Sequence, residues 1–164
     1  YDISILGFNF RINEINSSLG ISQIKKVNKF INIKKKIAKQ YFEKLNLPEI
    51  SLPDKRILQV SALHLFIIKI KFQKLKIDKF QLINILKKKN ININSHYIPL
   101  NRFSFIKKNI KSTRLINSER YYKEAISIPM YPDLINKKQK YFIKILIQII
   151  KKYKKIKNYY IFKI

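Results

Sequence analysis

Residues 63–70 read Leu-His-Leu-Phe-Ile-Ile-Lys-Ile, and this run decides the fold class. It combines aromatic and β-branched residues with a single lysine, which predicts a strand buried on both faces over most of its length. A helix should follow, because Asp78 offers an N-cap and Gln81 the returning amide of a capping box. Lysines 87–89 close that helix at the negative end of its dipole. Its apolar face carries Phe80, Ile83 and Leu86.

The region before this strand is predicted to be helical over residues 11–45. Apolar residues recur there every three to five positions, with lysines on the opposite face. One stripe consists of Ile12, Ile15, Leu19, Ile24 and Val27, and a second of Phe30, Ile33, Ile37 and Tyr41. Gly20 costs about 1 kcal/mol relative to alanine inside a helix, so we expect another element to approach closely there. Residues 47–54, which hold two prolines, end the helical region.

After the capped helix, apolar and polar side chains alternate over residues 91–97, which predicts a second strand with one polar face. Pro99 ends this strand. A short helix over residues 118–125 and an extended segment over 126–132 should follow.

The last element is a helix preceded by a predicted capping pair, Asn136 and Gln139. Its apolar face carries Phe142, Ile143, Leu146 and Ile150. The expected order is therefore long helix, strand, helix, strand, helix, helix, which is typical of a small α+β domain with few strands.

The composition excludes several classes of site. The 164 residues contain no cysteine, so a disulfide framework, a thiolate zinc site and a cysteine nucleophile are excluded. Only two glycines and two histidines occur, which excludes a glycine-rich phosphate loop and disfavours a multi-histidine metal site. The apolar stretch 141–150 contains Lys144 and is too short to span a bilayer. No signal peptide is visible at Tyr1, and that start suggests a piece of a longer protein.

The charge is strongly basic, with 36 lysines and arginines against 9 acidic residues and a net charge of +27. Such a charge alone would favour a nucleic-acid or anionic-membrane partner. Only five of the basic residues are arginine, the residue preferred for gripping phosphates, and the lysines are scattered through every segment. We therefore favour a solvated basic surface and keep a basic nucleic-acid-binding module as an alternative hypothesis.

Four short motifs stand in a characteristic order. They are Gly7-Phe8-Asn9-Phe10-Arg11 leading into a helix with Leu19-Gly20-Ile21, then His64-Leu65-Phe66, then His96-Tyr97-Ile98-Pro99-Leu100, and finally Ser127-Ile128-Pro129-Met130-Tyr131-Pro132. Each motif alone is a weak signal, whereas their joint order and spacing across nearly the whole chain is specific.

Together these motifs resemble the C-terminal part of the pyridoxal-phosphate-dependent sugar aminotransferases of the DegT/DnrJ/EryC1/StrS family. The resemblance implies the small C-terminal α+β domain of a fold type I pyridoxal-phosphate-dependent transferase, preceded by a long connecting helix. It divides the chain at residue 50. Residues 1–50 would be the motif loop and the helix leading to a large domain outside this chain, and residues 51–164 the small domain.

The resemblance also implies site residues. Asn9 matches an asparagine that contacts the phosphate of pyridoxal 5'-phosphate across a dimer interface; the alternative is a turn residue before a helix. Arg11 is a candidate substrate-binding residue, and support of the helix start is an equal alternative. His96 and Tyr97 match residues beside the nucleotide-sugar site, where a neutral imidazole can hydrogen-bond a diphosphate or a sugar hydroxyl.

Other positions are expected to be structural or depart from the family pattern. His64 opens an apolar strand and is expected to be a structural histidine with satisfied hydrogen bonds. Asn101 stands where the family often has a second histidine, and Arg102 is a candidate to supply the missing charge. No segment resembles the family's Schiff-base lysine segment, so we assign no catalytic residue and no metal ligand, and we expect this portion alone to be inactive.

The implied activity of the longer parent is transfer of an amino group, usually from glutamate, to a UDP-linked 4-keto-6-deoxy sugar of the pseudaminic acid type. Enzymes acting on other nucleotide-linked 4-keto sugars are similar alternatives. The expected partners are the nucleotide sugar, the amino donor and a second copy in a homodimer, with no specific nucleic acid, no membrane and a cytoplasmic location. A truncated relative without activity is a further hypothesis.

Overall fold

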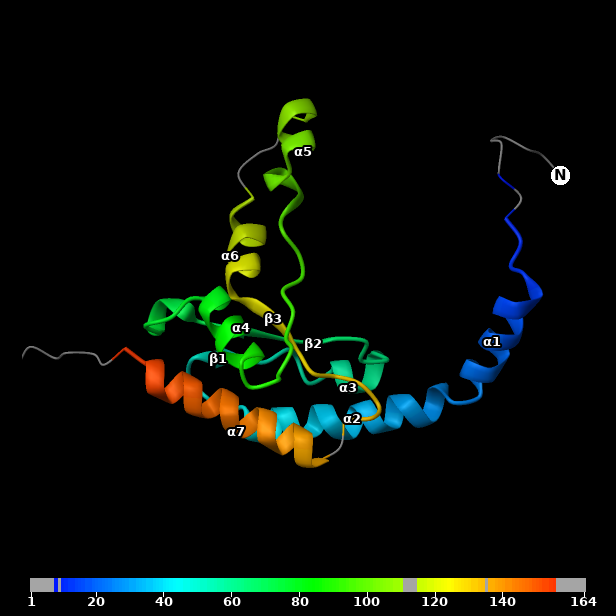
Figure 1. Cartoon of the computed structure of the whole chain (residues 1–164), viewed down its shortest axis with the longest axis horizontal. Helices are drawn as coiled ribbons and strands as arrows, with labels where there is room; N and C mark the ends of the chain where they lie inside the picture. The colour runs from blue at the N-terminus through cyan, green and yellow to red at the C-terminus, as the bar shows by residue number, and fades with distance from the viewer. Residues whose placement is uncertain (1–7, 9, 111–114, 135, 156–164) are drawn as a thin grey trace, which may run out of the picture.

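The computed structural model describes residues 8, 10–110, 115–134 and 136–155. In chain order the elements are α1 (Glu14–Ile24), α2 (Val27–Lys44), β1 (Ile50–Ser51), α3 (Ile57–Val60), β2 (Phe66–Ile70), η1 (Phe72–Lys74), α4 (Lys79–Lys87), η2 (Leu100–Arg102), α5 (Ser104–Asn109), α6 (Ile116–Glu124), β3 (Ala125–Ile128) and α7 (Asn136–Tyr153). Figure 1 shows α2 and α7 crossing below the small sheet, with α5 and α6 projecting above it and α1 rising apart from the body. The predicted α+β class is confirmed.

The sheet has three antiparallel strands in the order β1-β2-β3. Strand β2 is central: Ile70 pairs with Ile50 of β1, and Phe66 pairs with Ile128 of β3. The expected strand over residues 63–70 is thus confirmed in its second half. Its burial alternates, with Lys69 exposed, so the prediction of a strand buried on both faces is wrong for this element.

The predicted strand over residues 91–97 does not form. Asn94 alone makes a bridge to Ser127, with backbone N–H to O distances of 3.2 and 2.7 Å. The amide of Ile91 instead donates to the Leu86 carbonyl at the end of α4, which leaves few residues free for pairing before the chain turns away. The alternation did predict burial of Ile91 and Ile93, whereas Tyr97, expected on the same face, is exposed.

The predicted helix over residues 11–45 divides into α1 and α2 at a turn formed by Lys25 and Lys26. Asn13 caps α1, because its side-chain oxygen accepts from the Asn16 amide at 2.8 Å. The second apolar stripe is buried progressively along α2 and ends in the core at Tyr41. The first stripe is exposed along its whole length. The expected close approach at Gly20 is also wrong, since no described atom would lie within 4 Å of an added Cβ.

The core lies between the sheet and helices α2, α4 and α7. Phe66 is fully buried at its centre, with its ring 5.2 Å from the Tyr41 ring and 5.3 Å from the Phe42 ring. The Tyr41 hydroxyl donates to the Pro129 carbonyl at 2.7 Å, which ties α2 to the segment after β3. The apolar face predicted for α7 is buried as expected.

Two expectations about helix ends and faces are wrong. Gln139 does not cap α7; its buried side-chain amide donates to the Ile37 carbonyl of α2 at 2.8 Å, and Asn136 is the first residue of the helix. On α4 the predicted apolar face is wrong at Phe80, which is 59% exposed, and confirmed at Leu86; the other buried residues of the helix are Lys79 and Leu82.

The capping box of α4 is confirmed. The Asp78 carboxylate accepts from the Gln81 amide, and the Gln81 side-chain oxygen accepts from the Asp78 amide, both at 2.8 Å. We expect Asp78→Ala to lower the free energy of unfolding by about 1 kcal/mol, since one donor at the helix start loses its partner. Urea denaturation measures this loss. Asp78→Asn is the matched control, because asparagine keeps the accepting oxygen; an equal loss in both variants would contradict the capping role.

Candidate functional site

Three of the four sequence motifs meet at one cavity. The cavity has a volume of about 710 Å³ and lies between the segment after α4, strand β3 and the start of α7. Its lining includes Leu65 of the second motif, His96 of the third and residues 127–131 of the fourth. The motifs are distant in sequence and are brought together because β3 pairs with β2 on one side and bridges Asn94 on the other.

His96 is held at this cavity by the fourth motif. Its Nδ1 lies 2.7 Å from the Ser127 hydroxyl, and Ser127 is itself fixed by two backbone hydrogen bonds with Asn94. When the hydroxyl donates to Nδ1, the ring carries its proton on Nε2 and can donate from there. Half-buried His96 therefore has one nitrogen used for positioning and one left for a ligand.

Tyr97 follows His96 across a cis peptide bond, and the two ring centroids lie 4.6 Å apart in an edge-to-face arrangement. The Tyr97 side chain is 76% exposed, so it is accessible to a ligand or to a second polypeptide. Of the two predicted substrate-binding residues, His96 lines the cavity and Tyr97 is not among its lining residues.

The same cavity carries further polar groups. Lys89 and Lys138 contribute from two different helix ends, and Tyr131 and Tyr141 border it. The cavity is partly apolar and is bordered by lysine ammonium groups, an imidazole and tyrosine hydroxyls. Such a lining suits an anionic ligand that also carries a ring with polar substituents.

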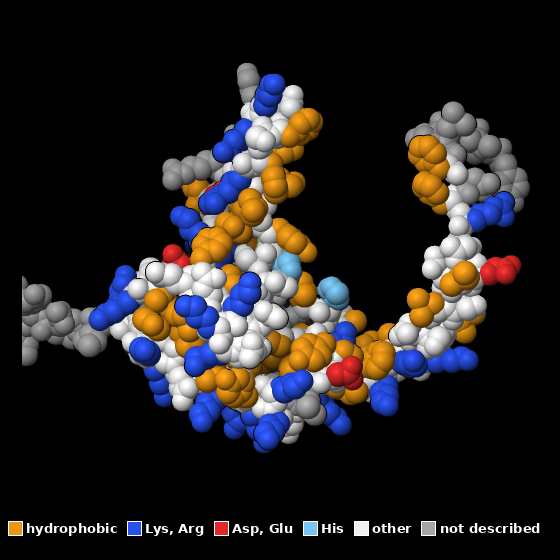
Figure 2. Space-filling view, in the orientation of Figure 1, with side chains coloured by type: hydrophobic (Ala, Val, Ile, Leu, Met, Phe, Trp, Pro, Cys, Tyr) orange, Lys and Arg blue, Asp and Glu red, His pale blue; other side chains and the backbone are white. Residues whose placement is uncertain are grey.

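The remaining predicted residues lie elsewhere. Arg11 is exposed in the arm that precedes α1, and Figure 2 shows a wide hollow between that arm and the rest of the molecule. No contact in the described part of the chain joins Arg11 to His96. Asn9, the predicted cofactor-binding residue, lies outside the described residues.

Two further residues were singled out in the sequence. His64 is exposed at the bend before β2 and does not line the cavity. Arg102 is engaged by Glu119, with Nε 2.9 and 3.1 Å from the two carboxylate oxygens, which raises the pKa of Arg102 and leaves it poorly placed to replace the charge missing at Asn101. The Asn101 side-chain oxygen is buried and has no partner among the described residues.

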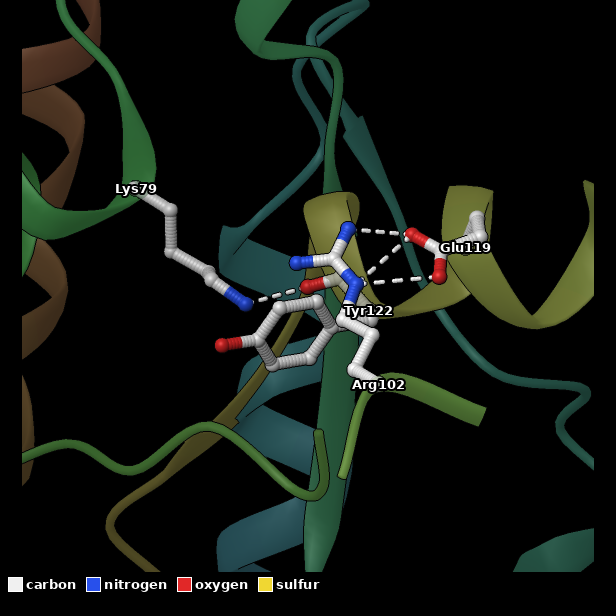
Figure 3. A network of polar contacts seen from close by, with 4 residues as sticks. All are labelled: Lys79, Arg102, Glu119 and Tyr122. Carbon is white, nitrogen blue, oxygen red and sulfur yellow. Dashed lines mark hydrogen bonds and ion pairs between the residues drawn. The ribbon is translucent and has the colours of Figure 1, made fainter. Parts of the chain in front are cut away.

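Sequence reasoning missed one polar cluster close to this site. Figure 3 shows Lys79, the first residue of α4, reaching the Tyr122 carbonyl beside the Arg102–Glu119 ion pair. The only sequence signal was a lysine directly after an N-cap, which is an ordinary position for a solvated side chain.

The basic charge is spread over the molecule. Figure 2 shows Lys and Arg side chains around the body, the projecting helices and the arm instead of one continuous patch on the visible face. In the described residues no group of His, Cys, Asp and Glu is arranged to hold a metal ion. No helix of the described part is long and apolar enough to cross a membrane.

The family model described as the DegT/DnrJ/EryC1/StrS aminotransferase family matches residues 1–147. The chain is 32% identical over 157 residues to a Campylobacter jejuni protein named UDP-4-amino-4,6-dideoxy-N-acetyl-β-L-altrosamine transaminase, covering 94% of this chain and 41% of that protein.

Solved structures of aminotransferases share the fold. Helicobacter pylori PseC, an aminotransferase involved in the biosynthesis of pseudoaminic acid, superposes with a TM-score of 0.78 at 23% identity, over 93% of this chain and 41% of that one. The PLP form of Spr1654 of Streptococcus pneumoniae, described as a sugar aminotransferase, gives a TM-score of 0.79 at 22% identity, over 93% and 39%.

The fold is that of part of a pyridoxal-phosphate-dependent sugar aminotransferase. The chain belongs to the DegT/DnrJ/EryC1/StrS aminotransferase family. It spans about two fifths of the length of the curated relative described above.

Proposed function

We propose that this chain is the C-terminal portion of a pyridoxal-phosphate-dependent nucleotide-sugar aminotransferase that acts on a UDP-linked 4-keto-6-deoxy sugar. The observation that carries the proposal is the convergence of three family motifs on the cavity beside His96. The similarity to the Campylobacter jejuni transaminase supports a substrate of the pseudaminic acid type. Glutamate is the proposed amino donor, and a homodimer in the cytoplasm the proposed form of the longer protein.

The described residues do not provide a complete site for the cofactor. Pyridoxal phosphate supplies an electron sink once it is joined to a lysine amine. Lys79 is the one buried lysine of the described part, and its ammonium group is already bonded to Ser95 and Tyr122. Glu49, the one buried carboxylate there, is paired with Lys154. As the resemblance to the family implies, the Schiff-base lysine and the carboxylate for the pyridine nitrogen would lie in a large domain outside this chain.

The role of this portion would be to bind and orient the substrate. His96 Nε2 would donate to the diphosphate or to a sugar hydroxyl, with Tyr97 covering the sugar and Arg11 neutralising a phosphate. Asn9 would contact the cofactor phosphate of a partner subunit. Residues 1–50 would connect to the large domain, and residues 51–164 would form the small domain. The exposed apolar stripe of α1 supports this division, because such a stripe is normally covered by another part of a protein.

The first experiment is to isolate the native gene product and measure its intact mass. A product much heavier than this chain, with pyridoxal phosphate attached to a lysine peptide upstream of Tyr1, supports the proposal. In that protein Asn9→Ala should weaken cofactor retention. A product limited to these 164 residues would contradict the proposed activity and favour an inactive relative.

A second experiment tests His96 directly. In the complete gene product, we expect His96→Ala to weaken the binding of uridine diphosphate about tenfold, because a hydrogen bond to a charged oxygen is lost. Isothermal titration calorimetry measures the change. His64→Ala is the matched control, since it removes the other histidine, which does not line the cavity. Equal affinities of the wild type and His96→Ala would contradict the proposed role.

A further inference from the structure

The chain makes a long excursion from the body just beside the cavity. This excursion comprises residues 95–110 and 115–124. Its outgoing leg begins at Ser95 and leads to α5, and its returning leg is α6, which leads back into β3. It carries Tyr97, η2, α5 and α6, and Figure 1 shows it projecting from the sheet. His96 is the second residue of its outgoing leg. A contact that holds Ser95 in place therefore also restricts the positions of His96 and Tyr97, which follow it in the chain.

Lys79 contacts both legs of the excursion at its base. Its ammonium nitrogen lies 2.6 Å from the Ser95 hydroxyl on the outgoing leg. The same nitrogen donates to the Tyr122 carbonyl on the returning leg and stands 3.8 Å from the centroid of the Tyr122 ring. One side chain from α4 thus joins two segments that are separated by more than twenty residues.

A second set of contacts continues the cluster outward. The Arg102 guanidinium carbon lies 5.1 Å from the Tyr122 ring centroid, and the guanidinium group is paired with Glu119 of α6. Figure 3 shows both cationic groups close to the Tyr122 ring. The outgoing leg is in this way attached to α6 twice, once through Lys79 and once through Arg102.

The electrostatic setting of Lys79 is unusual for a lysine. Lys79 is only 4% exposed. Among the described residues, no ion pair includes its ammonium group. Burial, and then the nearby charge of Arg102, lower the pKa of Lys79. A buried charge without a carboxylate partner costs stability unless hydrogen bonds and an aromatic face compensate for lost hydration. Because burying this lysine costs stability, its presence is better explained by a role in holding neighbouring segments in one position.

We propose that Lys79 is a positioning residue that holds the excursion in one orientation on the body and thereby sets the position of His96 and Tyr97. A methionine of similar length would fill the same space without hydrogen bonds or charge. The legs would then be held mainly by the Asn94–Ser127 bridge and the Arg102–Glu119 pair. The consequence for substrate binding rests on the proposed function, whereas the orientation of the excursion does not.

The absence of cysteine allows a direct test on the chain. Spin labels at Lys107→Cys in α5 and Lys144→Cys in α7 report the distance between excursion and body by double electron–electron resonance. We expect one narrow distance distribution with Lys79 and a distribution roughly twice as wide with Lys79→Met, because one anchor of a marginally stable segment is lost. Lys79→Arg keeps the charge and the donors, and it should restore a narrow distribution.

Two controls make the outcome decisive. Lys87→Met removes an exposed lysine from the same helix and should leave the distribution unchanged. Labels at Lys39→Cys in α2 and Lys144→Cys in α7 report on the body alone, and their distance should stay narrow with Lys79→Met. An unchanged excursion distance with Lys79→Met, equal broadening of the body distance, or no recovery with Lys79→Arg would each overturn the proposal. The readout needs no enzymatic activity, so it is independent of the proposed function.

Discussion

Phe66→Ala is expected to lower the free energy of unfolding by about 4 kcal/mol, because a fully buried aromatic side chain is removed from the centre of the sheet. The ring of Phe66 packs against the rings of Tyr41 and Phe42, so the substitution also removes two aromatic contacts. Those neighbours come from α2, and Phe66 itself pairs with Ile128 of β3. The cavity created would therefore lie between three elements that cannot all move inward to fill it.

Urea denaturation followed by circular dichroism measures this loss. A domain of this size is stabilised by about 5–15 kcal/mol, so the variant should unfold at a clearly lower urea concentration than the wild type. Phe105→Ala is the matched control, since it deletes the same atoms from a phenylalanine of α5 that is 71% exposed. A loss below 1 kcal/mol for Phe66→Ala, or equal losses for the two variants, would show that the core does not centre on β2.

How far the sequence predicted this fold depends on how local each signal is. The capping box of Asp78 and Gln81 and the apolar face of α7 follow from spacing within one or two turns, and both are confirmed. The strand predicted over residues 91–97 failed because the chain enters it from the end of α4, where the Ile91 amide donates to Leu86, and only Asn94 bridges to β3. Periodicity does not describe these contacts. The alternation only indicated which side chains would be buried there.

Side-chain hydrogen bonds between distant elements could not be predicted either. Gln139 has a spacing that suits a cap, yet it donates across the core to Ile37 of α2. Lys79 looked like one more solvated lysine among many, yet it is buried because Ser95 and Tyr122 are folded onto it. In both cases the local pattern allows two uses of the side chain, and only the tertiary arrangement decides between them.

In the candidate site, too, local motifs could be read from the sequence while contacts between distant elements could not. The resemblance of short motifs singled out His96 and Tyr97, whereas the Ser127 hydroxyl that orients the imidazole became evident only from the fold. Arg11 lies in the exposed segment before α1, and no contact in the described part of the chain joins it to His96. A substrate site built from all three residues would need α1 to be carried toward His96, or a second copy to supply its own Arg11.

Lys154→Met is expected to destabilise the protein at neutral pH by about 2 kcal/mol, since it leaves a buried carboxylate without its cation. The Glu49 side chain is 3% exposed, and Lys154 Nζ lies 2.8 Å from its Oε1. The Lys154 side chain is 54% exposed, so solvent screens the ion pair. The expected loss of stability is therefore smaller than for a fully buried pair. The hydrogen bond from Lys154 is the main cause of a lowered Glu49 pKa, and it outweighs burial, which acts in the opposite direction.

The pH dependence gives this prediction its sharpest test. Because the pKa of Glu49 is lower in the folded than in the unfolded state, its contribution is present above the unfolded value and is lost as the pH falls through the folded one. The stability difference between wild type and Lys154→Met should therefore shrink on acidification, since a protonated carboxyl no longer needs the cation.

Lys151→Met is the matched control, because it removes the same charge from an exposed position in the last turn of α7. It corrects for the relief of repulsion in a chain of net charge +27. Urea denaturation of the three proteins between neutral and acidic pH compares them directly. A Lys154→Met deficit that stays constant with pH would mean that the lost contact is the packing of the lysine stem and not the ion pair with Glu49.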